Sequence, residues 1–493
     1  MNSQSDNGQG GITRRRFLKA TAASGAGVVF ASNAFAKNLR SFTSTKRFAI
    51  VGVGARSRMW QEGLYGPHRD AGEVVGLCDT NPGRLRFYQA VAKKATGKTI
   101  PVFDAGNFDA MIRETKPDTV IVTTVDSFHH QYIVRAMQLG CDVITEKPMT
   151  NTEGKCQQIL EAQKKYGKTV TVSFNYRYSP ARTQVKDLLM SGVIGNVIST
   201  DFHWMLNTHH GADYFRRWHS LKQFSNGLLL HKATHHFDLM NWWLSAVPVR
   251  VAAMGKKEFY TPAMARRFGL SDFHERCHTC PEKKKCGFEL DLSADPQLKE
   301  LYLDNEQYDG YFRDRCVFRP EIDIEDTMNV LVKYSTNATM SYSLNAFNSW
   351  EGYSVIFNGT KGRLEHKVEE TVYVAGGGGM QGGIKPGGEY TKIFPIRGAS
   401  YDVSVWRGEG GHGGGDDLML KDIFAPEPKA DKYLRCADQR AGAFSLLTGV
   451  AANYSMTTGK EVSIEDLVKD IGMPEYPVMP SSIETVPMPD KSL

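Results

Sequence analysis

The chain has 493 residues, 41% of them hydrophobic and 23% charged, with 47 glycines and 20 prolines, and its formal net charge is +6. This composition is that of a globular protein, and the length allows two or three domains, each with a full core. The sequence contains no basic stripe interleaved with aromatic residues and no DNA- or RNA-reading motif, so we expect no nucleic-acid partner.

Residues 1–36 have the pattern of a targeting segment. Thr13-Arg-Arg-Arg-Phe-Leu-Lys19 precedes a weakly apolar stretch, Ala20 to Phe35, and Ala34-Phe35-Ala36 offers a small-x-small cleavage pattern. The first motif resembles a twin-arginine export signal at every position. An uncleaved anchor or a basic tail is the alternative, but a membrane span needs about 20 strongly apolar residues. We expect residues 1–36 to be removed, the twin-arginine translocase to be a partner during export, and the mature protein to be periplasmic or otherwise exported.

A short apolar run that ends in glycines comes next. Arg47-Phe-Ala-Ile-Val-Gly-Val-Gly54 predicts the first, buried strand of a parallel sheet. Gly52-x-Gly54-x-x-Ser57 then has the form of a turn whose backbone N–H groups bind a pyrophosphate at a helix N-terminus. Arg56 on the same turn could reach phosphate oxygens. Two glycines after a strand often make only a tight turn, so this motif alone is weak.

The following strand, Glu73-Val-Val-Gly-Leu-Cys-Asp79, strengthens the interpretation. Asp79 ends that strand about where an acidic group binds the ribose hydroxyls of NAD. Its charge would repel a 2′-phosphate, which favours NAD over NADP, although Arg84 nearby leaves NADP open. The alternative role for Asp79 is a turn-forming cap before Asn81-Pro82-Gly83.

The alternation of strands and helices continues along the chain. Residues 119–124 and 142–145 are apolar strands, and residues 131–140 between them form an amphipathic helix. This order predicts right-handed βαβ units and a doubly wound parallel sheet, whose ligands bind at the carboxyl ends of the strands. The side chains expected at that edge are Thr124, Asp126, His129, Glu146 and Lys147.

Four ordered motifs make the chain similar to the Gfo/Idh/MocA family (glucose–fructose oxidoreductase and inositol dehydrogenase) over about residues 46–470. That family has a Gly-x-Gly turn, an Asp after the second strand, Thr-Pro-Asn-x-x-His after the fourth and Glu-Lys-Pro after the fifth. Here the last two motifs are Thr124-Val-Asp126-Ser-Phe-His129 and Glu146-Lys147-Pro148, with departures at Val125 and Asp126. The residues expected to contact the cofactor are Gly52, Gly54, Arg56, Asp79, Thr124, His129 and Glu146.

The resemblance implies an α/β fold: an N-terminal Rossmann domain with a doubly wound parallel sheet over residues 46–170, and a C-terminal α+β domain with a mostly antiparallel open sheet over residues 171–470. Alternating apolar residues between 323 and 363 agree with such a sheet. Since the other face of this sheet builds dimers in the family, the resemblance also implies a homo-oligomer.

One histidine-rich segment, residues 231–243, carries the expected chemistry. Its apolar positions fit a buried helix, on which His231 and His235 would share one face. The family places Asp-x-x-x-His here, so the resemblance implies His235 as the acid/base, while His231 replaces the Asp. The carboxylate partner of His235 must then come from elsewhere, with Asp238 and Asp416 as candidates.

These residue types suit the oxidation of a secondary alcohol. A histidine can accept the O–H proton because its pKa lies near neutrality, and the ammonium of Lys147 can stabilise the developing alkoxide. Two histidines four residues apart also suit a metal ion, which could polarise the same hydroxyl. The alternative for the histidines is ordinary helix packing with hydrogen-bonded polar tips.

Further substrate-side candidates lie on both sides of this segment. Asn175 and Arg177 match the family's Asn-x-Arg step, and Arg177 is open between substrate binding and an ion pair with a core carboxylate. Gly410-Gly-His412-Gly-Gly-Gly-Asp416 is either a flexible surface loop or a segment that brings His412 and Asp416 to the substrate. We assign Arg177, His231, His412 and Asp416 to the substrate side.

The cysteines are spaced unevenly. Cys277-His-Thr-Cys280 is followed by Cys286 and Cys316, within what we interpret as an insertion at about residues 255–320 with little apolar core. A Cys-x-x-Cys pair with two further thiols is typical of a structural zinc site, and two disulfides or an iron–sulfur centre are the alternatives. The other four cysteines are expected only to pack.

The sequence thus predicts an exported NAD(P)-dependent oxidoreductase acting on a secondary hydroxyl of a sugar, glycoside or cyclitol. Twin-arginine substrates fold and load their cofactor before export, and a periplasmic enzyme meets no pool of free dinucleotide, so we expect the NAD to stay bound. One alternative is an NAD-dependent glycosidase of the N-acetylgalactosaminidase type, which oxidises, eliminates and reduces again; Lys147 argues against it, because those enzymes usually lack the lysine. The other is a non-catalytic sugar-binding protein.

Overall fold

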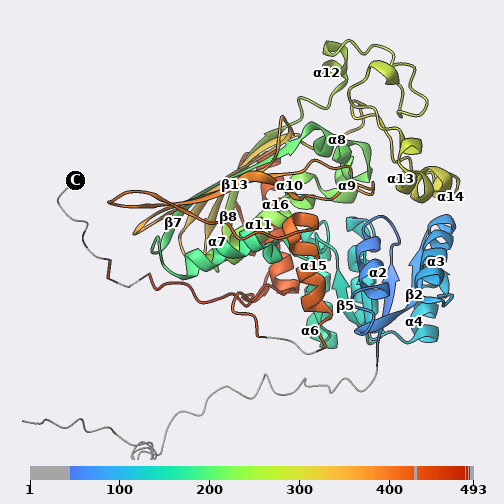
Figure 1. The fold of residues 1–493 in the computed structure, drawn as a ribbon, viewed down its shortest axis with the longest axis horizontal. Helices are drawn as coiled ribbons and strands as arrows, with labels where there is room; N and C mark the ends of the chain where they lie inside the picture. Colours follow the sequence, from blue (N-terminus) through green and yellow to red (C-terminus); the bar gives the residue numbers. More distant parts are fainter. Residues whose placement is uncertain (1–44, 427–429, 483–484, 487, 489–493) are drawn as a thin grey trace, which may run out of the picture. The chain divides into compact units, whose positions relative to one another are not determined.

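Two β-sheets and the helices packed on them organise the chain (Figure 1). The structure is a computed structural model that describes residues 45–426, 430–482, 485–486 and 488. The predicted export signal at residues 1–36 lies outside this part of the chain. The residues from Thr45 onward belong to one unit, and the fold is described for that unit alone.

The first sheet has seven strands in the order β15-β6-β5-β4-β1-β2-β3. Its neighbours are parallel, except that β15 runs antiparallel to β6. The buried part of β1, residues 48–51, is a continuous apolar run because helices cover both faces of a parallel sheet. The strands are β1 (Lys46–Val51), β2 (Gly72–Asp79), β3 (Val102–Asp104), β4 (Thr119–Val122), β5 (Asp142–Thr145), β6 (Val170–Val172) and β15 (Ala437–Asp438).

Helices α2 (Ser57–Tyr65), α3 (Pro82–Thr96), α4 (Phe108–Thr115), α5 (His129–Gln138) and α6 (Glu153–Tyr166) connect these strands. The chain begins α3 with a local signal: the Asn81 side chain accepts hydrogen bonds from the backbone of Gly83 and Arg84, and Pro82 follows it. Asn81, not Asp79, is therefore the cap. The order of strands reverses between β1 and β4, which opens a crevice at their carboxyl ends.

The second sheet has nine strands in the order β14-β13-β12-β11-β7-β10-β9-β8-β16. Strands β7 and β10 are parallel and the other neighbours antiparallel, so the predicted combination of a Rossmann sheet with a mostly antiparallel sheet is confirmed. The strands are β7 (Val197–Asn207), β8 (Pro248–Lys256), β9 (Thr327–Tyr334), β10 (Thr339–Asn348), β11 (Glu351–Gly359), β12 (Gly362–Glu370), β13 (Ile384–Pro395), β14 (Tyr401–Val403) and β16 (Val462–Ser463).

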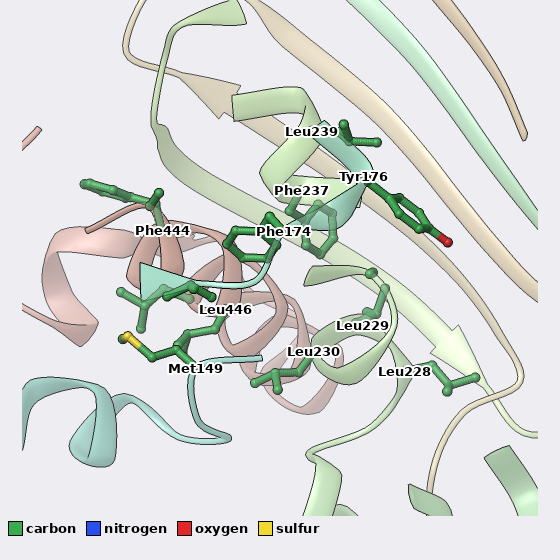
Figure 2. Packing of buried hydrophobic residues seen from close by; sticks show 14 of the residues in the cluster. Met149, Phe174, Tyr176, Leu228, Leu229, Leu230, Phe237, Leu239, Phe444 and Leu446 are labelled. Atoms are coloured by element: carbon green, nitrogen blue, oxygen red, sulfur yellow. The ribbon is translucent and has the colours of Figure 1, made fainter. Parts of the chain in front are cut away.

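A shared hydrophobic core connects the two sheets. Helix α16 (Gln439–Thr458) has a buried central part that packs on β8 and β6 and on helices α10 and α11. Figure 2 shows apolar side chains, among them Phe174, Phe237 and Leu446, gathered around these helices. The remaining helices of this half are α7 (Pro180–Met190), α8 (Thr208–Arg216), α9 (Lys222–Ser225), α10 (Leu228–His231), α11 (Thr234–Leu244), α15 (Gly411–Ile423) and α17 (Ile464–Leu467).

The cysteine-containing insertion lies between β8 and β9 and carries helices α12 (Pro262–Arg267), α13 (Pro296–Leu301) and α14 (Glu306–Asp309). We expected little apolar core here, and that expectation is wrong. The rings of Phe259, Phe268, Phe288 and Phe318 contact one another, with Phe318 fully buried. In Figure 1 the insertion, in yellow and olive, extends from the second sheet towards α3.

Among the described residues, none of the helices has both the length and the apolar character that crossing a bilayer requires.

Candidate active site

One cavity of about 1330 Å³ lies at the carboxyl edge of the first sheet. Helices α8 to α11, the start of α15 and the insertion form its other walls. This volume exceeds the range of roughly 300–1,000 Å³ that is usual for one small ligand, so two ligands can share the cavity. It brings together the predicted residues Gly52, Gly54, Arg56, Asp79, Thr124, His129, Glu146, Lys147, His231, His235, His412 and Asp416.

The glycine turn is shaped for the close approach of a ligand. Gly52 has a φ of +86°, and an added Cβ would lie 2.6 Å from the backbone nitrogen of Thr124, so only glycine fits. A Cβ on Gly54 would meet none of the described atoms within 4 Å, which leaves space beside the N-terminus of α2. Ser57, in the third glycine position, is buried and donates its hydroxyl hydrogen bond to the Gly54 carbonyl at 2.8 Å. The turn therefore fits a pyrophosphate.

Asp79 lies where the ribose of a dinucleotide would bind. Its Oδ2 accepts a 2.6 Å hydrogen bond from the Val53 N–H of the glycine turn. Its Oδ1 accepts one from Asn81 N and another from Arg84 Nη2. Each carboxylate oxygen has two lone pairs, so Oδ2 retains capacity for a ribose hydroxyl. The donor and acceptor set fits the cofactor that the sequence predicts.

Arg56 is held by two carboxylates. Its Nε donates to Glu146 Oε1 at 2.8 Å, and its Nη2 lies 3.6 Å from Asp416 Oδ1. Burial lowers the pKa of Arg56, but these two negative charges outweigh it and raise the pKa. The ion pairs join the glycine turn to β5 and α15, instead of leaving the guanidinium free for phosphate as we expected. Glu146 Oε2 is buried and has no partner among the described residues, which leaves one acceptor at the cavity wall.

His129 connects the ends of strands β4 and β5. Its two ring nitrogens lie 3.0 and 2.9 Å from the carbonyl oxygens of Thr124 and Pro148, and the ring is buried. These contacts tie the end of β4 to the segment that carries Lys147. Its position therefore supports holding that segment in place more than direct contact with a cofactor.

Lys147 is a half-buried ammonium in the cavity wall. No described residue accepts a hydrogen bond from its Nζ. Burial lowers its pKa to about 8; Asp126 and Glu146 oppose this, and the positive charges of Lys232 and Arg56 add to it. A strongly shifted group in a cleft is a typical feature of a functional site. This ammonium is available to an oxygen of a bound ligand.

His231 and His235 do not share one helix, so that expectation is wrong. His231 ends α10, and His235 lies in the first turn of α11, with Lys232 and Ala233 between the two helices. Both rings still line the cavity. The predicted partner of His235 is also wrong, because Asp238 pairs with Arg177 and Asp416 with His412.

The two rings have different surroundings. His231 Nδ1 lies 2.6 Å from Asp126 Oδ2, and both side chains are buried. The ring of His235 stacks on Tyr176, with centroids 4.1 Å apart and planes at 11°, and its buried Nδ1 has no hydrogen-bond partner among the described residues. Burial lowers the pKa of His235, and Lys147 lowers it further, so this ring stays neutral.

The glycine-rich segment forms the start of α15 instead of a flexible loop. His412, Gly413 and Gly414 have positive φ angles and are buried. A Cβ on Gly415 would lie 2.3 Å from the Asn175 carbonyl, so the segment packs closely on η3 (Asn175–Tyr178). This packing places the side chain of His412 at the cavity wall.

The imidazole of His412 pairs with Asp416, with 2.7 Å between Nδ1 and Oδ2. Asn175 Nδ2 donates to the other oxygen of Asp416 at 2.6 Å. Burial raises the pKa of Asp416, but His412 and Arg56 outweigh it, so the pKa falls below its usual range. Asp416 therefore carries a negative charge between the glycine turn and the substrate-side wall.

Arg177 does not line the cavity, so its assignment to the substrate is not supported. Its guanidinium forms a two-pronged ion pair with Asp238, at 2.8 and 2.6 Å, and both side chains are fully buried. Of the two roles that the sequence left open, the structure favours the core ion pair.

The insertion cysteines Cys277, Cys280, Cys286 and Cys316 surround a second, small cavity. All eight cysteines are free, and no group of three or more His, Cys, Asp or Glu side chains among the described residues could hold a metal ion. Burial raises the pKa of three of the four thiols, that of Cys316 to about 12. The predicted zinc site is not supported, and neither are the disulfides.

Several cavity residues escaped the sequence analysis. The density of aromatic and basic residues in Tyr214-Phe-Arg-Arg-Trp-His219 was one usable signal, and the aromatic residues near 302–312 were another. The missed wall residues are Tyr214, Arg217, Trp218, His219, Lys232, Tyr302, Tyr311 and Tyr373.

Comparison with known proteins decides the family. The NAD-binding Rossmann-fold model of the Gfo/Idh/MocA oxidoreductase family matches residues 46–174, and the C-terminal alpha/beta domain model of the same family matches residues 186–464. The chain belongs to the Gfo/Idh/MocA oxidoreductase family. It is therefore an NAD(P)-dependent oxidoreductase with a small-molecule substrate.

Relatives within the Gfo/Idh/MocA family differ in how much of the chain they match. Oxidoreductase YteT from Bacillus subtilis is 38% identical over 409 residues, which cover 80% of this chain and 92% of that protein. D-glucoside 3-dehydrogenase from Escherichia coli is 30% identical over 158 residues, 32% of this chain and 43% of that protein. A crystal structure of the WlbA dehydrogenase from Bordetella pertussis with NADH and UDP-GlcNAcA has a TM-score of 0.55 and 19% identity, over 85% of this chain and 99% of that one. That likeness shows the fold.

Proposed function

We propose that this protein is exported and oxidises a secondary hydroxyl of a sugar, glycoside or cyclitol, with NAD that stays bound between turnovers. The observation that carries the proposal is the position of Lys147: an ammonium of lowered pKa in the cavity that also holds the glycine turn and Asp79. The name of the relative D-glucoside 3-dehydrogenase supports a sugar as the substrate class.

Charged and neutral side chains that line the cavity suit the oxidation of an alcohol. Bound NAD supplies the acceptor for the hydride that leaves the carbon of the alcohol. Lys147 lies where its charge can stabilise the alkoxide that develops on the oxygen, and a neutral imidazole in the same wall can accept the hydroxyl proton. Aromatic side chains at the substrate side, such as Tyr214 and Trp218, can cover the apolar faces of a sugar ring.

Contacts between the insertion and the nucleotide half support a retained cofactor. Ala55 N of the glycine turn donates to the Tyr302 hydroxyl at 3.2 Å. At the N-cap of α3, Asn81 Nδ2 donates to the Asn305 carbonyl at 3.0 Å, and on α3 itself Arg86 lies over the Tyr308 ring at 4.9 Å. A dinucleotide bound on the turn would lie beneath this cover, so its release would require the insertion to move away.

The two alternative functions fit the cavity less well. A transient-oxidation glycosidase of the N-acetylgalactosaminidase type usually lacks the lysine after the fifth strand, whereas here Lys147 faces the cavity. A sugar-binding protein without catalysis would have no use for an ammonium of depressed pKa beside a nucleotide turn. NADP remains the alternative cofactor, and the homo-oligomer remains a prediction from the family.

The proposal is tested on purified full-length and mature protein. Denaturation should release a dinucleotide that mass spectrometry identifies as NAD. Adding glycosides, free sugars and cyclitols in turn to the intact protein should convert the bound cofactor to its reduced form, seen by absorbance, with one of these classes. Protein that carries no dinucleotide and binds neither NAD nor NADP when they are added would contradict the proposal. Export is tested separately, by locating the protein after the arginine pair Arg14-Arg15 is changed to Lys-Lys.

A further inference from the structure

We propose that the proton acceptor in this oxidation is His231, held by Asp126, rather than His235. The assignment rests on the function proposed above and deepens it, because it names the group that takes the substrate proton. It also joins two of the positions at which the chain departs from its family's motifs, Asp126 and His231.

The pair is built across the two halves of the fold. Asp126 begins the short turn η2 (Asp126–Phe128) that follows β4, and His231 ends α10. His231 Nδ1 and Asp126 Oδ2 lie 2.6 Å apart. Both side chains are buried and both line the cavity together with Lys147. The dyad and the Lys147 ammonium therefore line the same cavity.

The Asp126 carboxylate favours the tautomer of His231 that leaves Nε2 without a proton. With its N–H on Nδ1 directed at Asp126, a neutral His231 keeps its lone pair on Nε2. No described residue forms a hydrogen bond with His231 Nε2, so this nitrogen is the one left for a ligand in the cavity. After proton transfer the ring becomes an imidazolium, and the charge of Asp126 stabilises it, as the Asp of a Ser-His-Asp triad stabilises its histidine.

His235 lacks this support. Its Nδ1 is buried without a partner among the described residues. If Nε2 of this ring accepted a proton, the Nδ1–H would have no acceptor, and that costs free energy in a buried site. The face of the ring is already covered by Tyr176, which suits a wall of the site better than an acid/base.

The surroundings of the dyad shift the pKa values of both of its members. Burial lowers the pKa of His231, and Lys147 and Arg217 lower it further, so the ring is neutral at neutral pH. Burial raises the pKa of Asp126 well above its ordinary value, and the positive charges of Lys147 and Arg217 offset only part of that rise. The titratable and charged groups that face His231 are Asp126, His129, Lys147, Tyr214, Arg217, His219 and Lys232.

The step balances as a two-electron oxidation. The O–H bond of the alcohol breaks and its proton goes to His231 Nε2, while the C–H bond breaks and its hydride goes to the bound NAD. The C=O bond forms, the alcohol is oxidised and NAD is reduced. Asp126 moves no proton to the substrate and acts as a positioning residue.

The first test compares His231→Gln with His235→Gln in single-turnover hydride transfer. The probes are methyl glucoside, free glucose and myo-inositol, each added to protein whose NAD content and melting temperature have been measured. Loss of the acid/base should slow hydride transfer by a factor of about 10² to 10⁴ in His231→Gln. His235→Gln should slow it less than about tenfold, and His203→Gln, on β7 away from the cavity, should leave it unchanged. A rate within tenfold of the wild type in His231→Gln, or the larger loss in His235→Gln, would overturn the proposal.

Asp126→Asn tests the positioning role. It keeps an oxygen for Nδ1–H but removes the charge that stabilises the imidazolium, so the rate should fall by a factor of about 10 to 100, as losses of outer-shell partners typically do. The acid limb of the pH–rate profile should also move to lower pH, because the ring holds its proton less tightly. A profile with the wild-type acid limb would show that Asp126 only packs.

A measurement without substrate separates failure of this inference from failure of the proposed function. Nitrogen-15 NMR of labelled histidine, assigned with the His231→Gln variant, should show His231 as the Nδ1–H tautomer in the wild type. The Nε2–H tautomer would contradict the dyad, whether or not any probe reacts. Failure of all three probes to reduce bound NAD, with the Nδ1–H tautomer present, would count against the proposed substrate class and leave the dyad supported.

Discussion

Arg84 bridges two carboxylates that are more than 200 residues apart in the sequence. Its Nη2 lies 3.3 Å from Asp79 Oδ1, at the end of β2, and 2.5 Å from Asp309 Oδ2, in the insertion. The sequence left open whether Arg84 would attract a 2′-phosphate. With two carboxylates around one guanidinium, the local charge is negative and opposes that phosphate.

The first prediction concerns the choice between NAD and NADP. Replacing Asp309 with Asn should strengthen NADP binding relative to NAD, because it removes one negative charge and leaves Arg84 with a single partner. Asp79→Asn should also weaken NAD itself, because it removes the acceptor for the ribose hydroxyls. Titrating protein freed of its dinucleotide with each cofactor measures both effects. An unchanged NAD-to-NADP ratio in both variants would show that other groups decide the preference.

The second prediction concerns retention of the cofactor. Tyr308→Ala removes a contact between the insertion and Arg86 on α3, so bound NADH should dissociate several-fold faster. Tyr454→Ala is the matched control: its side chain has similar exposure and hydrogen-bonds Glu153, away from the cavity. Displacement of NADH fluorescence by excess NAD gives the rates. Equal rates in Tyr308→Ala and the wild type would mean that the insertion does not hold the cofactor.

The third prediction uses the lowered pKa of Lys147. Only the protonated amine stabilises an alkoxide, and the Lys147 pKa lies at about 8, so hydride transfer should decline as pH rises through about 8. An arginine at position 147 keeps its charge over this pH range. The Lys147→Arg variant should therefore transfer hydride more slowly than the wild type, but its rate should not fall as pH rises through about 8. Single-turnover rates between pH 6 and about pH 10 test this. The same alkaline decline in Lys147→Arg would assign it to another group.

The fourth prediction separates stability from substrate binding at Arg177. Asp238→Asn leaves a buried guanidinium without its counter-charge, which typically destabilises a protein by about 3–5 kcal/mol. Urea unfolding should show this loss, while the folded fraction at low temperature keeps its affinity for substrate. Glu461→Gln breaks the exposed pair with Arg250 and should leave stability close to the wild type. A weakened substrate affinity in folded Asp238→Asn would restore a substrate role for Arg177.

The sequence predicted the parts of the site that depend on local patterns. Glycines after a buried strand, and polar residues at strand ends, placed Gly52, Asp79 and Lys147 at one edge, because parallel strands end on the same side of a sheet. The division between α10 and α11 escaped prediction, since neither glycine nor proline separates His231 from His235.

Contacts between distant segments could not be predicted from one sequence. The pairing of Arg177 with Asp238 depends on how η3 packs on α11, and that of Asp126 with His231 on how the two halves meet. The contacts that the insertion makes with the nucleotide half have no periodic signal in the sequence either. Tyr302 lies at the C-terminal end of the six-residue helix α13, and Asp309 ends the four-residue helix α14.

Single-turnover hydride transfer in Lys147→Ala tests the central claim most directly. The variant should keep its NAD, because Lys147 does not belong to the glycine turn. Loss of one charge that stabilises the transition state typically costs a factor of about 10² to 10³, so reduction of the bound cofactor should slow by that much. Lys164→Ala, exposed on α6, controls for the loss of a lysine and should react at the wild-type rate. NAD-loaded Lys147→Ala that reduces its cofactor at a near-normal rate would contradict the account.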